Sequence, residues 1–237
     1  MIKEITGIVI NERNYSDNDK IITIFCNDGS LKNIKVVSGR KFKNTNRSKT
    51  QMFCNGEFII NENINKFSVL KNAMIKNAFL FLKLDIKKYY YGIYFCEFIT
   101  KIGYYTDLEE EVYSQFILML SRLEKEQSLE EIRIVYIFVL LKYLGLSPHF
   151  DNCVNCGNNN VVSIDYKLGG FICNNCLNHN NKYDIKTLAT IKKISMVDFK
   201  KLGKINLSSK VIYEIDFFLD KYIAYHLNIK LNSKAFL

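Results

Sequence analysis

The stretch KIITIFCNDGSLKNIKVV, at residues 20–37, joins two runs of apolar and β-branched residues through a short polar segment. β-branched residues favour strands, and the central Asn27-Asp28-Gly29-Ser30 is typical of a tight turn, so the stretch predicts a β-hairpin. Similar runs at 5–11, 51–61 and 66–75 predict three more strands, with a polar loop at 38–50. Five strands within about 75 residues favour a small closed barrel, for which the oligonucleotide-binding (OB) fold is the common solution.

The rest of the chain has the periodicity of helices. From residue 73 onward, apolar side chains recur at spacings of three and four, and Gly and Pro are rare. Capping-box sequences at 106–109 and 128–131 predict two helix starts. Asp184 is a predicted N-cap, and the last long helix is expected from Ser208 or Ser209 to about Leu227. We therefore expect an α+β protein, with an OB domain at 1–78 and a helical domain at 79–237.

Four of the seven cysteines form two CxxC pairs, Cys153 with Cys156 and Cys173 with Cys176, and sixteen residues separate the pairs. This spacing lets four thiolates converge on one Zn²⁺ ion in a tetrahedron. A hairpin turning at Gly169-Gly170 would complete a four-cysteine zinc ribbon at 150–182, inserted into the helical domain. Because four thiolates leave no position for water, the ion that we predict is structural.

Two disulfides or a redox-active CxxC are alternative interpretations of the same cysteines. A reducing compartment disfavours disulfides, and no thioredoxin-like pattern of strand and helix surrounds either pair. His149 precedes the first pair by four residues and His179 follows the second by three, so either could replace one cysteine as a ligand. Cys26, Cys54 and Cys96 lie in apolar contexts and are expected to be buried thiols.

A basic segment without carboxylates overlaps the second half of the predicted hairpin. No acidic residue lies between Asp28 and Glu57, and seven cations do: Lys32, Lys35, Arg40, Lys41, Lys43, Arg47 and Lys49. Phe42 and Phe53 lie among them. Single-stranded nucleic acid binds to cations that pair with its phosphates and to rings on which its bases stack. The alternative is a solvated loop whose lysines only increase solubility. A second basic run at 182–210, with eight lysines and two aspartates, is a weaker candidate.

Composition narrows the class of protein. The 237 residues carry a formal net charge of +9, 48% are apolar, and there are 11 Gly and 1 Pro, which excludes collagen-like and disordered chains. No uncharged apolar stretch reaches the roughly 18 residues of a membrane span. The amino terminus does not resemble a secretion signal, so we expect a cytoplasmic, nucleoid-associated protein.

The usual catalytic motifs are missing from the sequence. The phosphate-binding loop, the dinucleotide fingerprint and the zinc-protease motif do not occur. A nuclease would need a carboxylate cluster to hold Mg²⁺, and the basic segment has no carboxylate at all. We therefore expect no enzymatic activity.

Several segments resemble the RecO family of bacterial recombination mediators. They are Thr6-Gly7-Ile8-Val9-Ile10, the run from Arg13 to Phe25, Ser38-Gly39-Arg40 in place of a Lys-Gly-Ala-Arg-like loop, and Gln51-Met52-Phe53 in place of Gln-Pro-Phe. The CxxC pairs and the ending Leu231-Asn232-Ser233-Lys234 also fit. The chain departs from the family in lacking the Lys and Ala before Arg40 and in having Met52 where Pro is usual.

The resemblance implies an OB barrel, a helical domain, a zinc ribbon and DNA repair without bond cleavage. RecO proteins bind single- and double-stranded DNA, anneal complementary strands and act with RecR in the RecFOR pathway. They recognise the acidic, hydrophobic C-terminal tail of single-stranded DNA-binding protein (SSB) and help load RecA. By this resemblance, Arg13, Lys20 and Arg40 are the first expected DNA contacts. Five more DNA contacts are expected from their positive charge alone: Lys32, Lys35, Lys41, Lys43 and Arg47. The alternative function is a non-catalytic scaffold that binds only protein partners.

Overall fold

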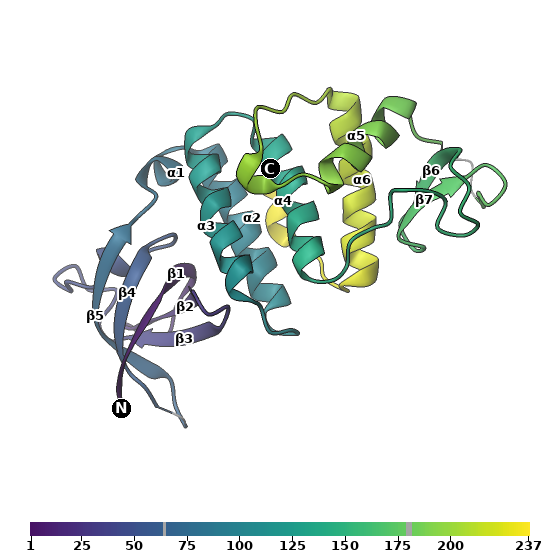
Figure 1. The fold of residues 1–237 in the computed structure, drawn as a ribbon. Coiled ribbons are helices and arrows are strands. Elements are labelled where there is room, and N and C mark those ends of the chain that lie inside the picture. Colours follow the sequence, from purple (N-terminus) through teal and green to yellow (C-terminus); the bar gives the residue numbers. More distant parts are fainter. Residues whose placement is uncertain (64, 179–181) are drawn as a thin grey trace. The chain divides into compact units, whose positions relative to one another are not determined.

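The computed structural model describes residues 1–63, 65–178 and 182–237 (Figure 1). The chain forms two compact units. Unit 1 contains Met1–Lys125 and Leu231–Leu237, and unit 2 contains Glu126–Lys230. The chain therefore leaves unit 1 once and returns to it at its end. No helix in the described part of the chain is both long enough and apolar enough to cross a membrane.

Five strands of unit 1 close into a barrel, as predicted. They are β1 (Ile2–Asn14), β2 (Lys20–Cys26), β3 (Leu31–Val36), β4 (Asn55–Asn61) and β5 (Ser68–Asn77). Their order around the barrel is β1-β2-β3-β5-β4. Long β1 pairs with β4 along its first half and with β2 along its second, with a bulge between Val9 and Asn11. The barrel closes through a short parallel pairing of β3 with β5, at Ile34 with Ser68 and Lys35 with Val69.

The second strand shows why these residues form this barrel. All seven residues of β2 are buried, because one face fills the barrel and the other meets a helix. Ile22 and Ile24 belong to the barrel core. Phe25 points the other way, and its ring lies 5.5 Å from that of Tyr113 and 5.8 Å from that of Phe116. A strand covered on both faces has a continuous apolar run rather than an alternating pattern.

Three helices of unit 1 follow the barrel in sequence: α1 (Leu80–Leu84), α2 (Ile86–Ile102) and α3 (Glu110–Lys125). Asp85 caps α2 by accepting hydrogen bonds from the backbone N–H groups of Lys87 and Lys88. The predicted helix start at Thr106 is wrong, because α3 begins at Glu110 and the Thr106 hydroxyl donates to the carbonyl of Asp107. The predicted strand 51–61 is shorter than expected and follows the 3-10 turn η1 (Ser48–Thr50).

Unit 2 consists of helices and a two-stranded hairpin. Its elements are α4 (Leu129–Tyr143), β6 (Val161–Asp165), β7 (Gly170–Cys173), α5 (Ile185–Ser195), the 3-10 turn η2 (Phe199–Lys201) and α6 (Ser209–His226). The predicted cap at Asp184 is confirmed, since its side chain accepts a backbone N–H of α5. The last helix begins at Ser209, as expected, and the Ser208 side chain caps it by accepting the N–H of Val211. Ser128 stands at the N-cap of α4, but its side chain makes no capping hydrogen bond.

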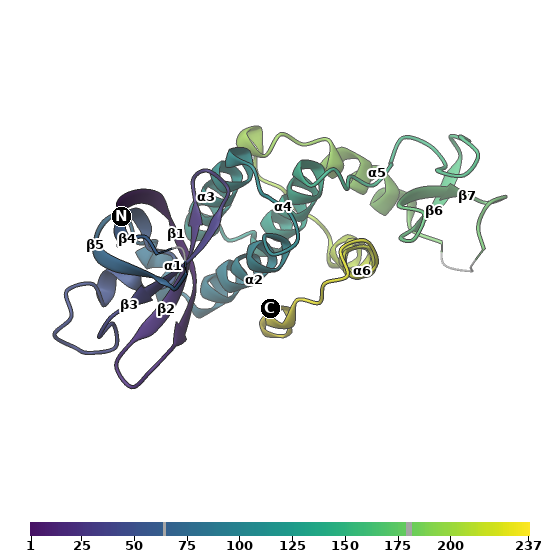
Figure 2. The same cartoon turned by 90° about the horizontal axis from the view of Figure 1, so that it is seen from below.

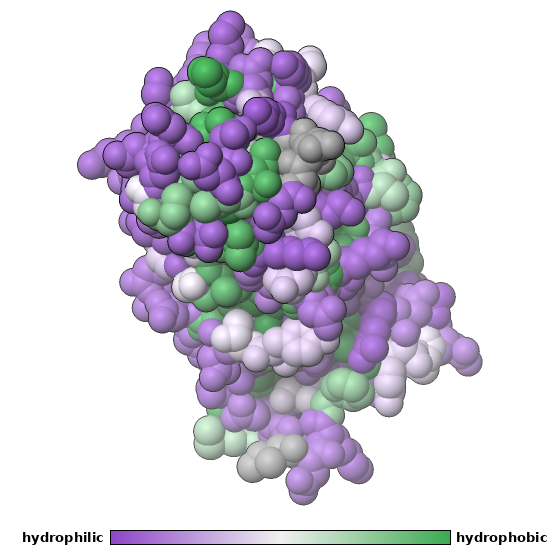
Figure 3. All heavy atoms as spheres, turned by 90° about the vertical axis from the view of Figure 1, so that its right-hand side faces the viewer, coloured by the Kyte–Doolittle hydropathy of each residue, from purple (hydrophilic) through white to green (hydrophobic). Residues whose placement is uncertain are grey.

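The hairpin is attached to the helices of unit 2 by aromatic and polar contacts. The Phe150 ring lies 4.9 Å from Phe171 of β7 and 5.8 Å from Phe218 of α6. The Tyr166 carbonyl lies 2.8 Å from Nε2 of His226. Figure 2 shows the hairpin beside α5 and α6. The face drawn in Figure 3 is mostly hydrophilic, with hydrophobic residues in small areas between polar ones.

The last residues of the chain form the 3-10 turn η3 (Asn232–Phe236), which packs on α2 within unit 1. The ring of Phe236 is stacked on that of Tyr90, with centroids 5.0 Å apart.

The three cysteines outside the CxxC pairs, Cys26, Cys54 and Cys96, are buried free thiols, as expected. Burial raises the pKa of Cys26 to about 11.

Candidate nucleic-acid interface and metal centre

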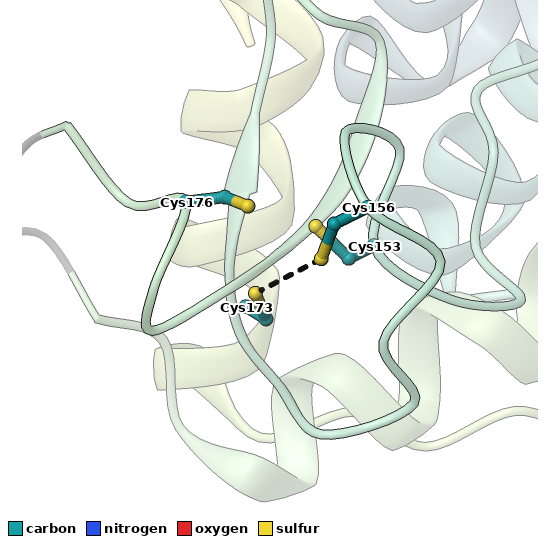
Figure 4. Close-up of side chains that lie close together, drawn as sticks. All are labelled: Cys153, Cys156, Cys173 and Cys176. Carbon is teal, nitrogen blue, oxygen red and sulfur yellow. Dashed lines mark hydrogen bonds between the residues drawn. The ribbon is translucent and has the colours of Figure 1, made fainter.

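The four cysteines of the CxxC pairs come together at the hairpin of unit 2 (Figure 4). Their Sγ atoms all lie within 4.8 Å of one another, and those of Cys156 and Cys173 are 3.6 Å apart. Four sulfurs bonded to one Zn²⁺ at about 2.3 Å are separated by roughly 3.8 Å. The donor set and its spacing therefore fit a tetrahedral metal ion.

Local backbone geometry holds the first CxxC pair in place. The N–H of Cys153 donates to the carbonyl of Asn158, and the N–H of Gly157 donates to the carbonyl of Cys153. Gly157 has a φ of 74°, which glycine adopts without strain. Burial acts to raise the pKa of the Cys153 thiol, but nearby backbone N–H groups, that of Cys173 foremost, lower it to about 6. At Cys156 the backbone N–H of Asn158 acts to lower the pKa, but hydrogen bonds among the four thiols outweigh it and raise the pKa, so without a metal ion the negative charge of the cluster is favoured at Cys153.

Of the two histidines considered as replacement ligands, His149 lies outside this cluster. Nε2 of His149 lies 2.8 Å from Oδ1 of Asn152, and His149 is not among the residues of the cluster. His179 lies outside the described residues. All seven cysteines are free in the structure.

Four of the eight predicted DNA contacts line one groove on the barrel. This arginine groove has a volume of about 550 Å³. It is lined by Glu12, Arg13, Asn14, Lys20, Gly39, Arg40, Arg47 and Gln51. Arg13 comes from the end of β1, whereas Arg40 and Arg47 come from the loop after β3. The fold thus gathers cations that are up to 34 residues apart, from Arg13 to Arg47.

The three arginines of the groove are exposed, and neighbouring groups orient Arg40 and Arg47. Nη1 of Arg40 donates to the carbonyl oxygens of Ser16 and Asp17, at 3.0 Å each. The guanidinium of Arg47 lies 5.5 Å from the centre of the Phe42 ring, and 89% of Phe42 is exposed. The contacts of Arg40 and Arg47 are with carbonyl groups and a ring, so both keep their positive charge available to an anion.

Lys20 lies at the base of the groove and has a structural role there. Its side chain is buried, and Nζ donates to Oε2 of Glu12 at 2.7 Å and to the carbonyl of Thr50 at 2.8 Å. It therefore ties the loop that carries the arginines to β1 and β2. Contact of Lys20 with a phosphate stays a prediction.

A second hollow, the aromatic hollow, lies where β3 meets β5. Its volume is about 940 Å³. It is lined by Tyr15, Lys32, Asn33, Ile34, Lys35, Glu62, Asn63, Asn65, Lys66, Phe67, Ser68 and Val69. Two more predicted contacts, Lys32 and Lys35, are thus in this hollow. Lys35 forms an ion pair of 2.8 Å with Asp19, and Lys32 lies 3.8 Å from Glu62. The last two, Lys41 and Lys43, are exposed in the loop next to Arg40.

The aromatic residues at the interface differ from those that the sequence suggested. Phe53 is fully buried and packs against Tyr89, so it cannot stack on a base. Tyr15 and Phe67, which sequence reasoning missed, line the hollow instead. Both lie in connections between strands, and OB barrels bind oligonucleotides with such loops. This property of OB barrels could have identified Tyr15 and Phe67 from the sequence, because both residues lie in such loops.

Comparison with family models covers nearly the whole chain. The model described as "Recombination protein O N terminal" matches residues 1–79, and the one described as "Recombination protein O C terminal" matches residues 83–235. The chain belongs to the RecO family. This agrees with the resemblance in the amino-terminal segments and in the CxxC pairs.

Curated RecO proteins match over almost their full length. The "DNA repair protein RecO" of Oceanobacillus iheyensis is 25% identical over 237 residues, which cover 94% of this chain and 89% of the relative. That of Alkaliphilus metalliredigens is 24% identical, covering 98% and 97%. That of a Thermoanaerobacter species is 27% identical, covering 98% and 95%.

Membership of the RecO family makes this chain a DNA repair and recombination protein, and the family is one of non-catalytic mediators. In this RecO chain, the barrel carries the two candidate nucleic-acid surfaces, the arginine groove and the aromatic hollow. The four cysteines of unit 2 have the geometry of a metal centre. All eight predicted DNA contacts stay predictions at the level of individual residues.

Proposed function

We propose that this RecO protein binds single- and double-stranded DNA through its barrel and anneals complementary strands. The observation that carries the proposal is the convergence of Arg13, Arg40 and Arg47 on one groove. Guanidinium groups form paired hydrogen bonds to phosphates. An exposed set of them on an OB-like barrel is suited to the backbone of a polynucleotide.

Annealing follows from the same electrostatics. Two complementary strands repel each other through their phosphates, and cations that pair with the phosphates reduce this repulsion. Base pairing then supplies the free energy of duplex formation, so the step needs no nucleotide hydrolysis. A protein that only holds and neutralises strands can therefore accelerate pairing.

We further propose that the protein acts with RecR and the C-terminal tail of SSB to help load RecA onto SSB-coated DNA, in the cytoplasm at the nucleoid. Membership of the RecO family supports these partners. The alternative is a scaffold that binds proteins only. It would keep the partner contacts and show no affinity for oligonucleotides.

One structural zinc ion is proposed for the metal centre. Cys153, Cys156, Cys173 and Cys176 would hold it, and the bound ion would supply four bonds that cross-link the hairpin. Four thiolates fill a tetrahedral zinc, so the ion would have no position for a substrate. The fold of the ribbon, rather than any reaction, would depend on it.

Fluorescence anisotropy with a labelled oligonucleotide tests the DNA-binding proposal. The triple variant R40E/K41E/K43E should bind far more weakly than the wild type because it reverses Arg40 in the groove and two exposed lysines that follow it in the same loop. The matched control K87E/K125E/K221E reverses three exposed lysines elsewhere and should bind nearly as well as the wild type. Equal affinities of the two variants would show that the groove is not the DNA surface. A wild-type protein that ignores oligonucleotides at low salt would favour the scaffold.

A further inference from the structure

We propose that Tyr15 and Phe67 in the aromatic hollow form a stacking site for one unpaired base of single-stranded DNA. The inference rests on the proposed function and adds to it the means by which this chain distinguishes an open strand from a duplex. Neither ring is part of the basic segment that first suggested DNA binding. The site depends on the geometry of the rings, on the charges around them and on their position in the barrel.

The two rings form an edge-to-face pair. Their centroids are 5.7 Å apart and their planes meet at 76°. Nζ of Lys35 lies 5.1 Å from the centre of the Tyr15 ring, at a distance typical of a cation–π contact. The Tyr15 ring is thus held by two neighbours, although 52% of the residue is exposed. A ring that is both held in place and exposed loses little conformational freedom when a flat ligand stacks on it.

The charges around the rings suit a nucleotide rather than an apolar ligand. Lys32, Lys35 and Lys66 line the hollow, and Glu62 is the one carboxylate among its described lining residues. Asp19, outside the lining, pairs with Lys35, so three cations are set against two carboxylates. The phosphates on either side of a stacked base would therefore meet an excess of positive charge. Single-stranded DNA binds in grooves that combine cations with aromatic rings in this way.

The topology of the barrel accounts for the space. β3 and β5 pair over only two residue pairs, so the barrel wall is short at this point. Tyr15 comes from the loop after β1 and Phe67 from the loop after β4, and the two loops meet across β3. The resulting volume of about 940 Å³ is within the range of sites that take ligands of nucleotide size.

Consecutive residues of the chain line the arginine groove and the hollow. Asn14 lines the groove and Tyr15, the next residue, lines the hollow. A strand whose phosphates contact Arg13 could therefore place a neighbouring base on Tyr15. In a duplex the bases are stacked on each other and are not available to the ring. Both single- and double-stranded DNA can make phosphate contacts in the groove, whereas only a single strand can stack a base on the rings.

Substitution of the rings tests this inference in the full-length protein. The variant Y15L/F67L should bind a single-stranded oligonucleotide about 5- to 100-fold more weakly than the wild type, the range that loss of one stacked base gives. Affinity for a duplex of the same length should change less than about twofold. The slope of affinity against salt should also stay the same, because no charge is removed. The conservative Y15F should retain wild-type binding. The matched control Y105L removes a tyrosine of unit 1 that is 82% exposed and should have no effect.

Three results would overturn the inference. Single-strand affinity within twofold of the wild type in Y15L/F67L would show that the rings do not contact a base. Equal losses for single strand and duplex would show that the rings only shape the loops, and thermal unfolding of the variant would show whether the barrel still folds. If the wild type binds neither form of DNA, the proposed function fails together with this inference. If the wild type binds and the ring variant binds equally well, only the stacking site fails.

Discussion

Replacement of Glu97 by glutamine should weaken the attachment of the carboxyl-terminal segment to α2. The Glu97 carboxylate accepts the backbone N–H groups of Asn232 at 2.9 Å and Ser233 at 2.8 Å, and also the hydroxyl of Ser233. It pairs with Lys101 at 2.8 Å as well. The chain returns to unit 1 only at Leu231, and this carboxylate fastens the start of η3 to α2 through three hydrogen bonds. Glutamine keeps the shape but loses the charge and one of the two acceptor oxygens.

The pKa of Glu97 gives the size and the sign of the effect. Partial burial acts to raise the pKa, but hydrogen bonds from Lys101, Ser233 and Asn232 outweigh it and lower the pKa from 4.5 to about 2. Each pKa unit is about 1.4 kcal/mol, so the shift corresponds to at most roughly 3.5 kcal/mol. The ion pair with Lys101 lies within α2 and stays when the segment opens, and the Glu97 side chain is 19% exposed. Allowing for that pair and for screening by water, we expect about 2 kcal/mol from the docked segment. Because the pKa of the docked state is the lower one, this stabilisation is complete above about pH 4.5 and is lost as the pH falls toward 2.

Hydrogen exchange at the amides of Asn232 and Ser233 is the assay, because both donate to Glu97. Near neutral pH, E97Q should open the segment about 30-fold more often, the equivalent of about 2 kcal/mol. After correction for intrinsic exchange rates, wild-type protection should decline between pH 4.5 and 2, whereas E97Q should show no such decline. The control E4Q changes an exposed carboxylate of β1 and should leave both amides unchanged. Equal protection in E97Q and the wild type would refute the reasoning.

Three further predictions concern the groove and the metal centre. Replacing Arg40 and Arg47 by glutamine should make the plot of log affinity for single strands against log salt concentration less steep by about 1.4, since each phosphate contact contributes about 0.7. An unchanged slope in an anisotropy titration would show that neither residue contacts a phosphate. Metal analysis of the reduced protein should find about one zinc per chain, and the variant C173S should lose this zinc. A chelator should abolish hydrogen-exchange protection in β6 and β7. Protein that contains no metal after purification under reducing, zinc-replete conditions would contradict the site. K20M should lower the free energy of unfolding in urea by about 1–3 kcal/mol, because it leaves the buried carbonyl of Thr50 without its donor. By contrast, K41M, at an exposed lysine, should change it by less than about 0.5 kcal/mol, and equal effects would show that Lys20 does not hold the loop.

The strands of the barrel could be predicted because their determinants are local. The run at 20–26 forms β2 as expected, and the turn after it contains Gly29, whose φ is 88°. Glycine adopts this conformation without the strain that a side chain would add. The CxxC pairs are local as well, since two short knuckles and a hairpin bring their sulfurs together.

The start of α3 could not be predicted because a distant part of the chain decides it. A Cβ added to Gly29 would lie 1.9 Å from the carbonyl oxygen of Leu108, so the segment after Thr106 lies directly against the β2–β3 turn. Leu108 is buried there, and α3 begins only at Glu110. A capping sequence is a local preference, and a tertiary contact of this kind overrides it.

The amino-acid sequence alone determined the class of fold, the five strands, the four cysteines that cluster and the excess of cations near the amino terminus. Only the tertiary structure decided which cations share a surface: it placed Arg13, Arg40 and Arg47 in one groove and used Lys20 to hold the loop. It also buried Phe53 and brought Tyr15 to Phe67, 52 residues further along the chain. Strand propensity and CxxC spacing act between near neighbours in the chain. Exposure and convergence depend on closure of the barrel, which joins segments that no local pattern relates.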